Sequence, residues 1–319
     1  MMAANPETIG LLLMAYGSPE DLSQMEAYLM DVRGGRAPSA ELIEEIGRRY
    51  KMIGGKSPLL ERTSQQARAL EDELNKRLAN GENKPFKAFV GMRHWQPRIH
   101  SAINQMAAAD IQKAVAVVMA PHSSRLSTGK YYQMLDEALD GQTIDFIRIQ
   151  SWHKHPALLS AILEKIEIGL DKFGDSVPYI VFTAHSLPTQ ILEMGDPYDE
   201  QLNETARLLA ERLKLRAEQW QFCYQSAGEN AIPWLGPQIE DVVVELANKG
   251  EKNILVVPIG FVCDHVEVLY DIDIRARQIA EHHGARLERT PSLNDSPTFV
   301  AALADVVQEH LSLNKPWTE

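Results

Sequence analysis

The sequence predicts an α/β protein with two doubly wound halves, each a parallel sheet flanked by helices, that face a central cleft. Three observations predict this fold. Short apolar runs without polar alternation, such as Ile9–Ala15 and Ile254–Val257, are typical of strands buried on both faces of a parallel sheet. Segments with helical periodicity follow these runs, as in βαβ units. The order of the segments then repeats in the second half of the chain.

The first half begins with the strand Ile9–Ala15, which ends at Tyr16-Gly17-Ser18. Ser18 followed by Pro19 predicts a helix that runs to about Met30. A second helix is predicted from Ser39 and a long polar helix from Ser57 to Leu78. The remaining segments alternate in the same way, with strands within 86–97, 114–124 and 143–156 and helices over 99–109, 130–140 and 157–170.

The second half follows the same plan. YIVFTAHSLP (179–188) corresponds to LLLMAYGSP, FCYQSAGENAIPWLGP (222–237) to FVGMRHWQP, and ILVVPIGF to VAVVMAPH. We therefore predict two domains, residues 1–176 and 177–319, and expect the last helix, about 297–312, to pack back on the first domain. Two such halves place the carboxyl ends of their strands around one cleft, where open α/β sheets bind ligands.

Composition excludes several classes of protein. The 319 residues include 32 basic and 44 acidic side chains, a formal net charge of −12, which argues against nucleic-acid binding. Two cysteines, Cys223 and Cys263, are too few for a disulfide framework or an iron–sulfur cluster, and we expect both in the core. The N-terminus lacks a secretion signal, and no apolar stretch reaches the roughly 18–20 residues of a membrane span. We expect a cytoplasmic monomer.

A row of acidic residues follows the strand Ile254–Val257. Pro258 and Gly260 interrupt the apolar run, and a helical pattern begins. Asp264, Glu267 and Asp271 are spaced i, i+3 and i+7, which predicts three carboxyl groups in one line from the mouth of the strand outward. The alternative is a set of first-turn charges that favour the helix dipole, with Asp271 paired to Arg275.

His185 closes the apolar run Tyr179–Ala184 and precedes a rigid Leu187-Pro188 exit. A neutral imidazole that faces the carboxylates forms a proton-transfer or metal-capture pair near pH 7. The alternative is a histidine whose ring is satisfied by main-chain carbonyls. Phosphate-binding glycine motifs and the GxSxG nucleophile motif are absent from the sequence. We interpret the pairs His153/His155 and His282/His283 as surface residues, because no further ligand lies at metal-binding spacing.

TAHSLP, VPIGFVCDHVEVLYDID, QSAGENAIPWLGP and the opening LLLMAYGSP together resemble the ferrochelatase family, in order and over nearly the whole chain. The stretch DVRGGRAPS…RRYKMIGGKSPL is similar to the soluble bacterial branch, several of whose enzymes insert iron into coproporphyrin III and not into protoporphyrin IX. The resemblance implies two Rossmann-like halves that enclose a porphyrin cleft, with porphyrin and Fe²⁺ as substrates and no tightly bound cofactor.

The resemblance also implies roles for individual residues. His185 and Glu267 would bind the incoming Fe²⁺ and receive protons, and Asp271 would extend a relay outward. Tyr16 would lie over the macrocycle, and Ser226 near the same cleft. The residues implied to line the pocket and hold propionates are Arg33, Arg49, Tyr50, Ser57 and Tyr131. Taken singly, the arginines also suit helix C-terminal cations, Ser57 a helix cap and the tyrosines core positions.

We therefore expect a haem-biosynthesis enzyme that inserts Fe²⁺, with coproporphyrin III favoured over protoporphyrin IX. A chelatase that loads cobalt into a corrin precursor matches these motifs less well. A tetrapyrrole carrier without turnover is the other alternative, although such a carrier would be expected to lack His185 and Glu267. Two departures from the family pattern stand out: Arg275 occupies the place where the acidic row continues in many relatives, and Gly34 replaces a second basic residue after Arg33.

Overall fold

The computed structural model describes residues 7–78, 85–228 and 232–313; residues 229–231 of the QSAGENAIPWLGP segment and the N-terminal residues 1–6 lie outside this description. The described chain contains two four-stranded parallel sheets. The first has the order β2-β1-β3-β4 and the second β6-β5-β7-β8, so the same neighbour pattern occurs twice. The strands are β1 (Ile9–Ala15), β2 (Phe86–Met92), β3 (Lys113–Val118), β4 (Asp145–Ile149), β5 (Tyr179–His185), β6 (Trp220–Gln225), β7 (Asn253–Pro258) and β8 (Arg286–Arg289). The predicted fold class and internal repeat are confirmed.

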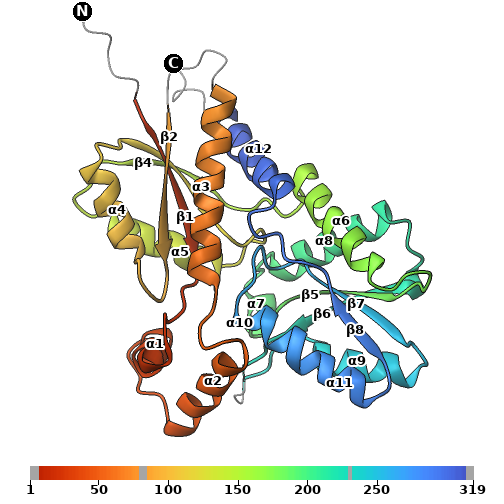
Figure 1. The fold of residues 1–319 in the computed structure, drawn as a ribbon. Coiled ribbons are helices and arrows are strands. Elements are labelled where there is room, and N and C mark those ends of the chain that lie inside the picture. The colour runs from red at the N-terminus through yellow and green to blue at the C-terminus, as the bar shows by residue number, and fades with distance from the viewer. Residues whose placement is uncertain (1–6, 79–84, 229–231, 314–319) are drawn as a thin grey trace, which may run out of the picture.

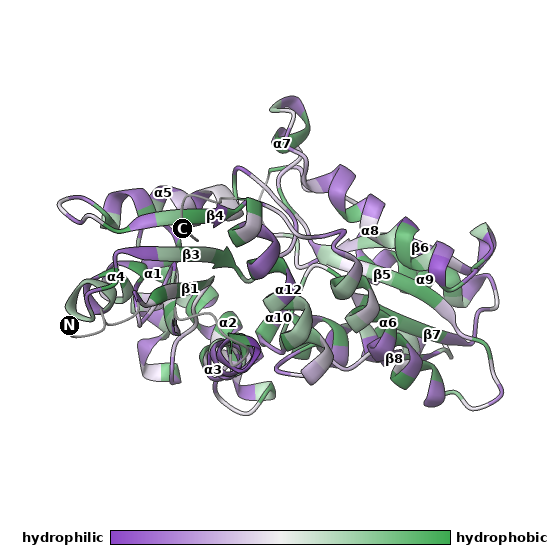
Figure 2. Cartoon of the chain, turned by 90° about the horizontal axis from the view of Figure 1, so that it is seen from above, coloured by the Kyte–Doolittle hydropathy of each residue, from purple (hydrophilic) through white to green (hydrophobic). Residues whose placement is uncertain are grey.

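Helices cover both faces of each sheet (Figures 1 and 2). They are α1 (Met25–Val32), α2 (Ala40–Met52), α3 (Leu59–Leu78), α4 (Ile99–Ala108), α5 (Thr128–Ala138), α6 (Pro156–Asp171), α7 (Gln190–Glu193), α8 (Tyr198–Arg212), α9 (Ile239–Asn248), α10 (Val266–Leu269), α11 (Arg277–His282) and α12 (Pro297–Leu313). Along β1, Leu11 and Leu13 face the core that includes α3, whereas Leu12 and Met14 face α4 and α5. This two-residue alternation between two apolar faces explains the unbroken hydrophobic runs.

The start of α1 differs from the prediction. The helix begins at Met25, after a short 3₁₀ turn (Leu22–Gln24) that Asp21 caps by accepting a hydrogen bond from the Ser23 amide (2.8 Å). Ser18 is buried at the cleft instead. The prediction for α2 is confirmed, because the Ser39 side chain accepts a hydrogen bond from the Leu42 amide (3.3 Å).

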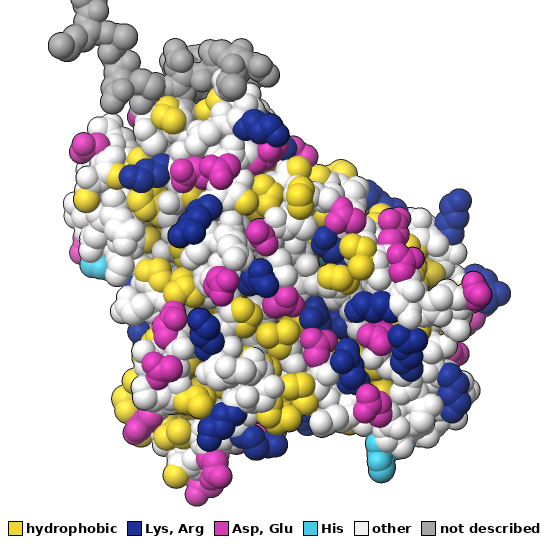
Figure 3. All heavy atoms as spheres, in the orientation of Figure 1, with side chains coloured by type: hydrophobic (Ala, Val, Ile, Leu, Met, Phe, Trp, Pro, Cys, Tyr) yellow, Lys and Arg dark blue, Asp and Glu magenta, His cyan; other side chains and the backbone are white. Residues whose placement is uncertain are grey.

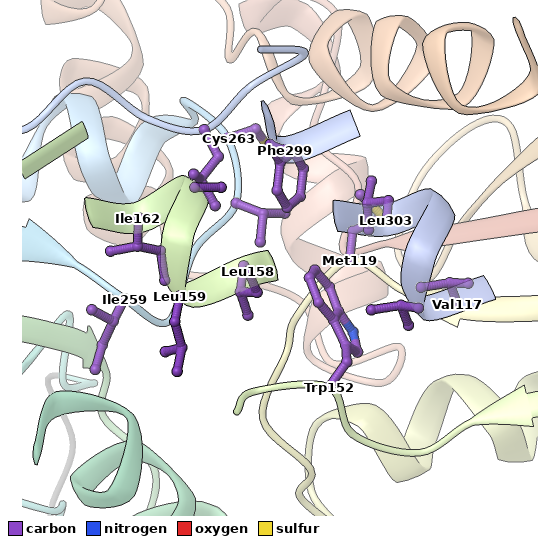
Figure 4. Close-up of a cluster of buried hydrophobic side chains, with 14 of the residues drawn as sticks. Val117, Met119, Trp152, Leu158, Leu159, Ile162, Ile259, Cys263, Phe299 and Leu303 are labelled. Atoms are coloured by element: carbon purple, nitrogen blue, oxygen red, sulfur yellow. The ribbon is translucent and has the colours of Figure 1, made fainter. Parts of the chain in front are cut away.

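The two sheets share one apolar core, drawn in Figure 4. Trp152, which follows β4, lies with its ring centroid 6.1 Å from that of Phe299 on α12. Ile259 and Cys263, which follow β7, belong to the same cluster. Helix α12 packs against α3 and α6, so it lies between the two sheets (Figures 1 and 2). This shared core sets the relative position of the loops that form the cleft.

The surface carries mixed charge. The face in Figure 3 intersperses basic and acidic side chains, and apolar atoms gather over α1 and α2, where Met30 and Met52 are partly exposed. Across residues 7–78, 85–228 and 232–313, no helix has both the length and the apolar character needed to cross a membrane.

Candidate active site

A cavity of about 330 Å³ lies at the carboxyl ends of both sheets. Loops after β1, β2 and β3 form one wall, and loops after β5 and β7 form the other. Side chains that carry chemistry line both walls, namely Tyr16, Arg93, His94, His185, His265 and Glu267. The strand ends of two parallel sheets therefore converge on one polar pocket, which is the position expected for a ligand in this class of fold.

Glu267 lies between two imidazole rings. His185 donates from Nδ1 to the Ser186 carbonyl oxygen, which leaves its Nε2 facing Oε1 of Glu267 at 3.5 Å. His265 donates from Nδ1 to the Cys263 carbonyl oxygen (2.9 Å), and its Nε2 is 3.4 Å from the other carboxylate oxygen. Tyr198 supports the arrangement by donating to the carbonyl oxygen of His185 (2.9 Å). The main chain thus orients two ring nitrogens toward one carboxylate.

The charges of this group are coupled. Burial alone would lower the pKa of His185, but the adjacent carboxylate of Glu267 outweighs burial and raises that pKa to about 9. Burial likewise opposes ionisation of Glu267, yet His185 and His265 hold the pKa of its carboxyl well below the usual range. At neutral pH the pair is therefore an imidazolium and a carboxylate, and a metal cation must displace the imidazolium proton to gain Nε2 as a ligand.

The predicted row of three carboxylates is wrong for Asp264. Helix α10 begins only at Val266, so Asp264 precedes it. The carboxylate of Asp264 turns away and accepts hydrogen bonds from Ser292 (2.7 Å) and Asn294 (2.9 Å), with Arg289 3.3 Å away. These contacts with residues distant in sequence therefore take Asp264 out of the predicted row of carboxylates.

Asp271 keeps its place near Glu267 but not the partner that its spacing suggests. The amide of Arg275 bonds to the carbonyl oxygen of Tyr270 (2.8 Å), five residues back, in a π-helical turn over Asp271–Ala276. Arg275 then pairs with Glu240 (3.1 Å), and Asp271 accepts a hydrogen bond from Ser226. The proposed Asp271–Arg275 pair is wrong. Burial raises the pKa of Asp271 to about 6, with the charge of Glu267 adding to the shift and Ser226 opposing it.

The opposite wall is built around Tyr16. Its ring centroid lies 4.6 Å from that of His94, and the Arg93 guanidinium lies 5.9 Å from the same ring. Although 38% of Tyr16 is exposed, partial desolvation of its phenol at the cleft, followed by the charge of Glu267, raises the pKa of Tyr16 to about 12, so the phenol stays protonated. The next residue must be glycine: Gly17 has φ +95° and a Cβ there would lie 2.8 Å from the Trp95 amide nitrogen. This tight passage sets the position of Tyr16.

Comparison with known proteins decides the family. The ferrochelatase family model matches residues 8–311. The chain is 42% identical over 309 residues to the ferrochelatase of Deinococcus radiodurans, across 95% of this chain and 96% of that protein. It is 39% identical over 312 residues to a coproporphyrin III ferrochelatase of a Geobacillus species, across 96% and 98%. The chain belongs to the ferrochelatase family.

Solved structures agree on the fold. SirB from Bacillus subtilis with Fe³⁺ superposes with a TM-score of 0.59 at 11% identity, across 97% of this chain and 98% of that one. CbiX from denitrifying bacteria gives a TM-score of 0.55 at 13% identity, across 94% and 98%. These likenesses show that the ferrochelatase-family chain has a chelatase fold.

The other residues implied by the resemblance divide into two groups. Tyr50, Ser57 and Tyr131 are buried and line the cavity, although Ser57 also accepts a long hydrogen bond from the Leu59 amide (3.4 Å), as a helix cap would. The other group, Arg33, Arg49 and Ser226, is not part of the cavity lining.

Those three residues have different surroundings. Arg33 is exposed at the end of α1, where it also suits a helix C-terminal cation. Arg49 lies over the ring of Tyr270 at 5.5 Å. Ser226, with φ +61°, donates a hydrogen bond to the carboxylate of Asp271. The ligand-binding roles of all these residues stay predictions.

Two histidines, His122 and His265, lie in loops that the sequence places at the cleft, but the sequence does not predict their contacts. His265, two residues before Glu267 in the chain, contacts that carboxylate directly. His122 is buried at the cavity and bonds to Thr205 (2.9 Å). The prediction that His153 lies on the surface is wrong, since it is buried between Ser151 and Glu204 (2.7 Å each). His282 and His283 are exposed, as predicted, and both cysteines are buried and free.

Gly260 sets the distance between the loop after β7 and strand β5, which ends at His185. A Cβ at this position would lie 2.6 Å from Cβ of Ala184, beside His185 on β5. We expect Gly260→Ala to push the loop after β7 away from β5 and to lower turnover by on the order of 10²-fold, because small misplacements of reacting groups are costly. Gly47→Ala on α2, where a Cβ meets nothing within 4 Å, is the matched control. Equal rates of iron insertion for the two variants would contradict the expectation.

Proposed function

We propose that this protein is a ferrochelatase that inserts Fe²⁺ into a porphyrin and prefers coproporphyrin III to protoporphyrin IX. The observation that carries the proposal is the carboxylate of Glu267 between Nε2 of His185 and Nε2 of His265, at the end of a cleft between two sheets. A hard oxygen and a borderline nitrogen form a suitable donor set for Fe²⁺. Fe²⁺ is a substrate in this proposal, so the reaction needs no resident cofactor.

The proposed reaction exchanges one cation for two protons. Fe²⁺ replaces the two pyrrole protons of the macrocycle, and the charge of the porphyrin–metal product balances when both protons leave. His185 gives up its proton before Nε2 can bind metal or accept a pyrrole proton, because one nitrogen lone pair serves one partner at a time. Glu267 compensates the charge of the approaching cation. Asp271, next to Glu267 and bonded to Ser226, extends the acidic path from the cleft.

The preference for coproporphyrin III rests on the positively charged side chains at and near the cavity, because the relatives include enzymes of both names. Arg93 lines the cavity, and its guanidinium lies over the rings of Tyr16 and Tyr131. Arg33 adds positive charge at the end of α1, and Arg49 on α2 adds a guanidinium that is already paired with Glu45. Guanidinium groups suit propionate carboxylates through paired hydrogen bonds. Relatives of similar identity carry either the plain name ferrochelatase or the name coproporphyrin III ferrochelatase. A substrate with four propionates makes fuller use of these cations than one with two.

The test is anaerobic Fe²⁺ insertion followed by absorbance, with coproporphyrin III and protoporphyrin IX supplied separately. We expect the higher kcat/KM with coproporphyrin III. A preference for protoporphyrin IX would support the ferrochelatase activity but contradict the proposal that these arginines bind propionates of the substrate. Porphyrin binding without any metal-dependent spectral change would favour the tetrapyrrole carrier, which His185 and Glu267, facing each other at 3.5 Å, argue against.

A further inference from the structure

We propose that Gln66 and Asn294 are positioning residues that hold the loop over 259–265 so that Glu267 stays between His185 and His265. Gln66 lies on α3, which packs on the first sheet, and Asn294 precedes α12. Neither residue lines the cavity. The inference rests on the proposed function for its kinetic consequence, whereas its structural consequence can be measured without turnover.

Gln66 joins α3 to the loop after β7. Its Nε2 donates to the carbonyl oxygens of Val262 (3.0 Å) and Asn294 (2.9 Å), which are 196 and 228 residues away in sequence. The side chain is fully buried, and its Oε1 has no hydrogen-bond partner among the described residues. An unpaired buried acceptor is unfavourable, so an apolar side chain would suit packing better here. The contribution of Gln66 is therefore the pair of hydrogen bonds that its Nε2 donates to the loop and to Asn294.

Asn294 holds the same loop from the other side. Its main-chain amide donates to the Val262 carbonyl oxygen (3.0 Å), and its Oδ1 accepts from the Asp264 amide (2.9 Å). Its Nδ2 donates to the Asp264 carboxylate (2.9 Å). The residue has φ +44°, a conformation that asparagine tolerates better than most residues. Gln66 and Asn294 therefore share Val262 as a common point of attachment.

The rest of the loop leaves little freedom. Ile259 and Cys263 are buried in the shared apolar core (Figure 4). Gly260 approaches β5 so closely that its missing Cβ would meet Ala184. Hydrogen bonds from side chains outside the loop hold Val262 and Asp264. Packing therefore fixes some residues of the loop, and hydrogen bonds fix others. His265 is the last residue of this loop and Glu267 follows two residues later, so a shift of the loop moves both relative to His185.

This arrangement makes distinct predictions for two variants. Gln66→Met keeps the shape of the side chain and removes both donated bonds. Asn294→Gly keeps the positive φ and removes both side-chain bonds to Asp264. We expect each variant to lower kcat for iron insertion by about 10- to 100-fold, as is typical when partners that orient metal ligands are removed. The porphyrin KM should stay within about twofold, because neither residue lines the cavity.

A control variant and an independent readout separate positioning from loss of stability. Arg77→Met, on the same helix, removes bonds from α3 to Asp305 (2.7 Å) and Gln308 (2.7 Å) on α12 and leaves the loop untouched. It is expected to lower the Tm and to leave kcat unchanged. Amide hydrogen exchange of the peptide over 259–267 should become faster in Gln66→Met and Asn294→Gly and stay as in the unaltered chain in Arg77→Met.

The outcomes are decisive in both directions. Combining Gln66→Met with Asn294→Gly should lower kcat less than the product of the two single effects, because both release the same short loop, the first at Val262 and the second at Asp264. Unchanged loop exchange together with unchanged kcat in both single variants, at a temperature where both are folded, would overturn the proposal. If the unaltered protein itself inserts no iron, the proposed function fails, and the exchange experiment still tests the positioning of the loop.

Discussion

Replacing His185 with alanine is expected to abolish iron insertion while porphyrin binding stays measurable. The substitution removes the nitrogen that faces Glu267 at 3.5 Å, and with it the proposed metal ligand and proton acceptor. Loss of a positioned acid–base group typically costs on the order of 10²–10⁴-fold in rate. The measurements are single-turnover Fe²⁺ insertion under anaerobic conditions and porphyrin affinity by fluorescence quenching.

His282→Ala is the control for this experiment, because His282 is exposed on α11 and is not part of the cavity lining. It should insert iron at the rate of the unaltered protein. Near-normal turnover in His185→Ala would contradict the proposed role of His185 as metal ligand and proton acceptor. Loss of porphyrin binding in that variant would indicate that the histidine supports the structure of the cleft and not the chemistry.

The central strands could be predicted because the local sequence determines them. The central strands β1, β3, β5 and β7 are buried along most of their length, so each appears as an apolar run, and β1 has the predicted bounds Ile9–Ala15. The repeat of strand, loop and helix then indicates two sheets with a shared cleft. His185 could be singled out for the same reason, since it ends such a run. Its ring is both held by the Ser186 carbonyl oxygen and directed at a carboxylate, so each of the two alternatives describes one nitrogen.

The acidic row could not be predicted correctly, because distant residues decide it. A regular helix through Asp264, Glu267 and Asp271 is the simplest reading of their spacing. Arg289, at the end of β8, and Asn294, which follows it, bind Asp264, and the π-helical turn changes the direction of the side chains that follow it. Neither effect leaves a periodic signal in the local sequence. The predicted start of α1 was wrong for a similar reason, because Ser18 lies buried at the cleft and not at the end of a helix.

Iron insertion at limiting Fe²⁺ is expected to rise about tenfold per pH unit from about pH 7 and to level off near pH 9. The Glu267 carboxylate raises the pKa of His185 to about 9, so below that pH most molecules hold a proton on Nε2. Only the neutral ring can bind metal or accept a pyrrole proton. The stability of the fold depends on pH in the opposite sense. The ion pair between His185 and Glu267 stabilises the folded state fully below the ordinary histidine pKa of 6.5, and this stabilisation is lost as the pH rises through 9. Both side chains are about one-third exposed, at 30% and 32%, so solvent screening keeps this effect on the Tm small.

Glu267→Gln tests the cause of that pH dependence. Without the carboxylate charge, burial becomes the dominant influence and lowers the pKa of His185 below its ordinary value. The rising limb of the pH–rate profile should therefore disappear above pH 7, although the rate at every pH should fall because the proposed metal site loses the negative charge of its carboxylate. His185 should then titrate at a lower pH, which NMR of the metal-free protein can follow. A limb that stays near pH 9 in Glu267→Gln would show that another group, and not the His185–Glu267 pair, controls proton release at the cleft.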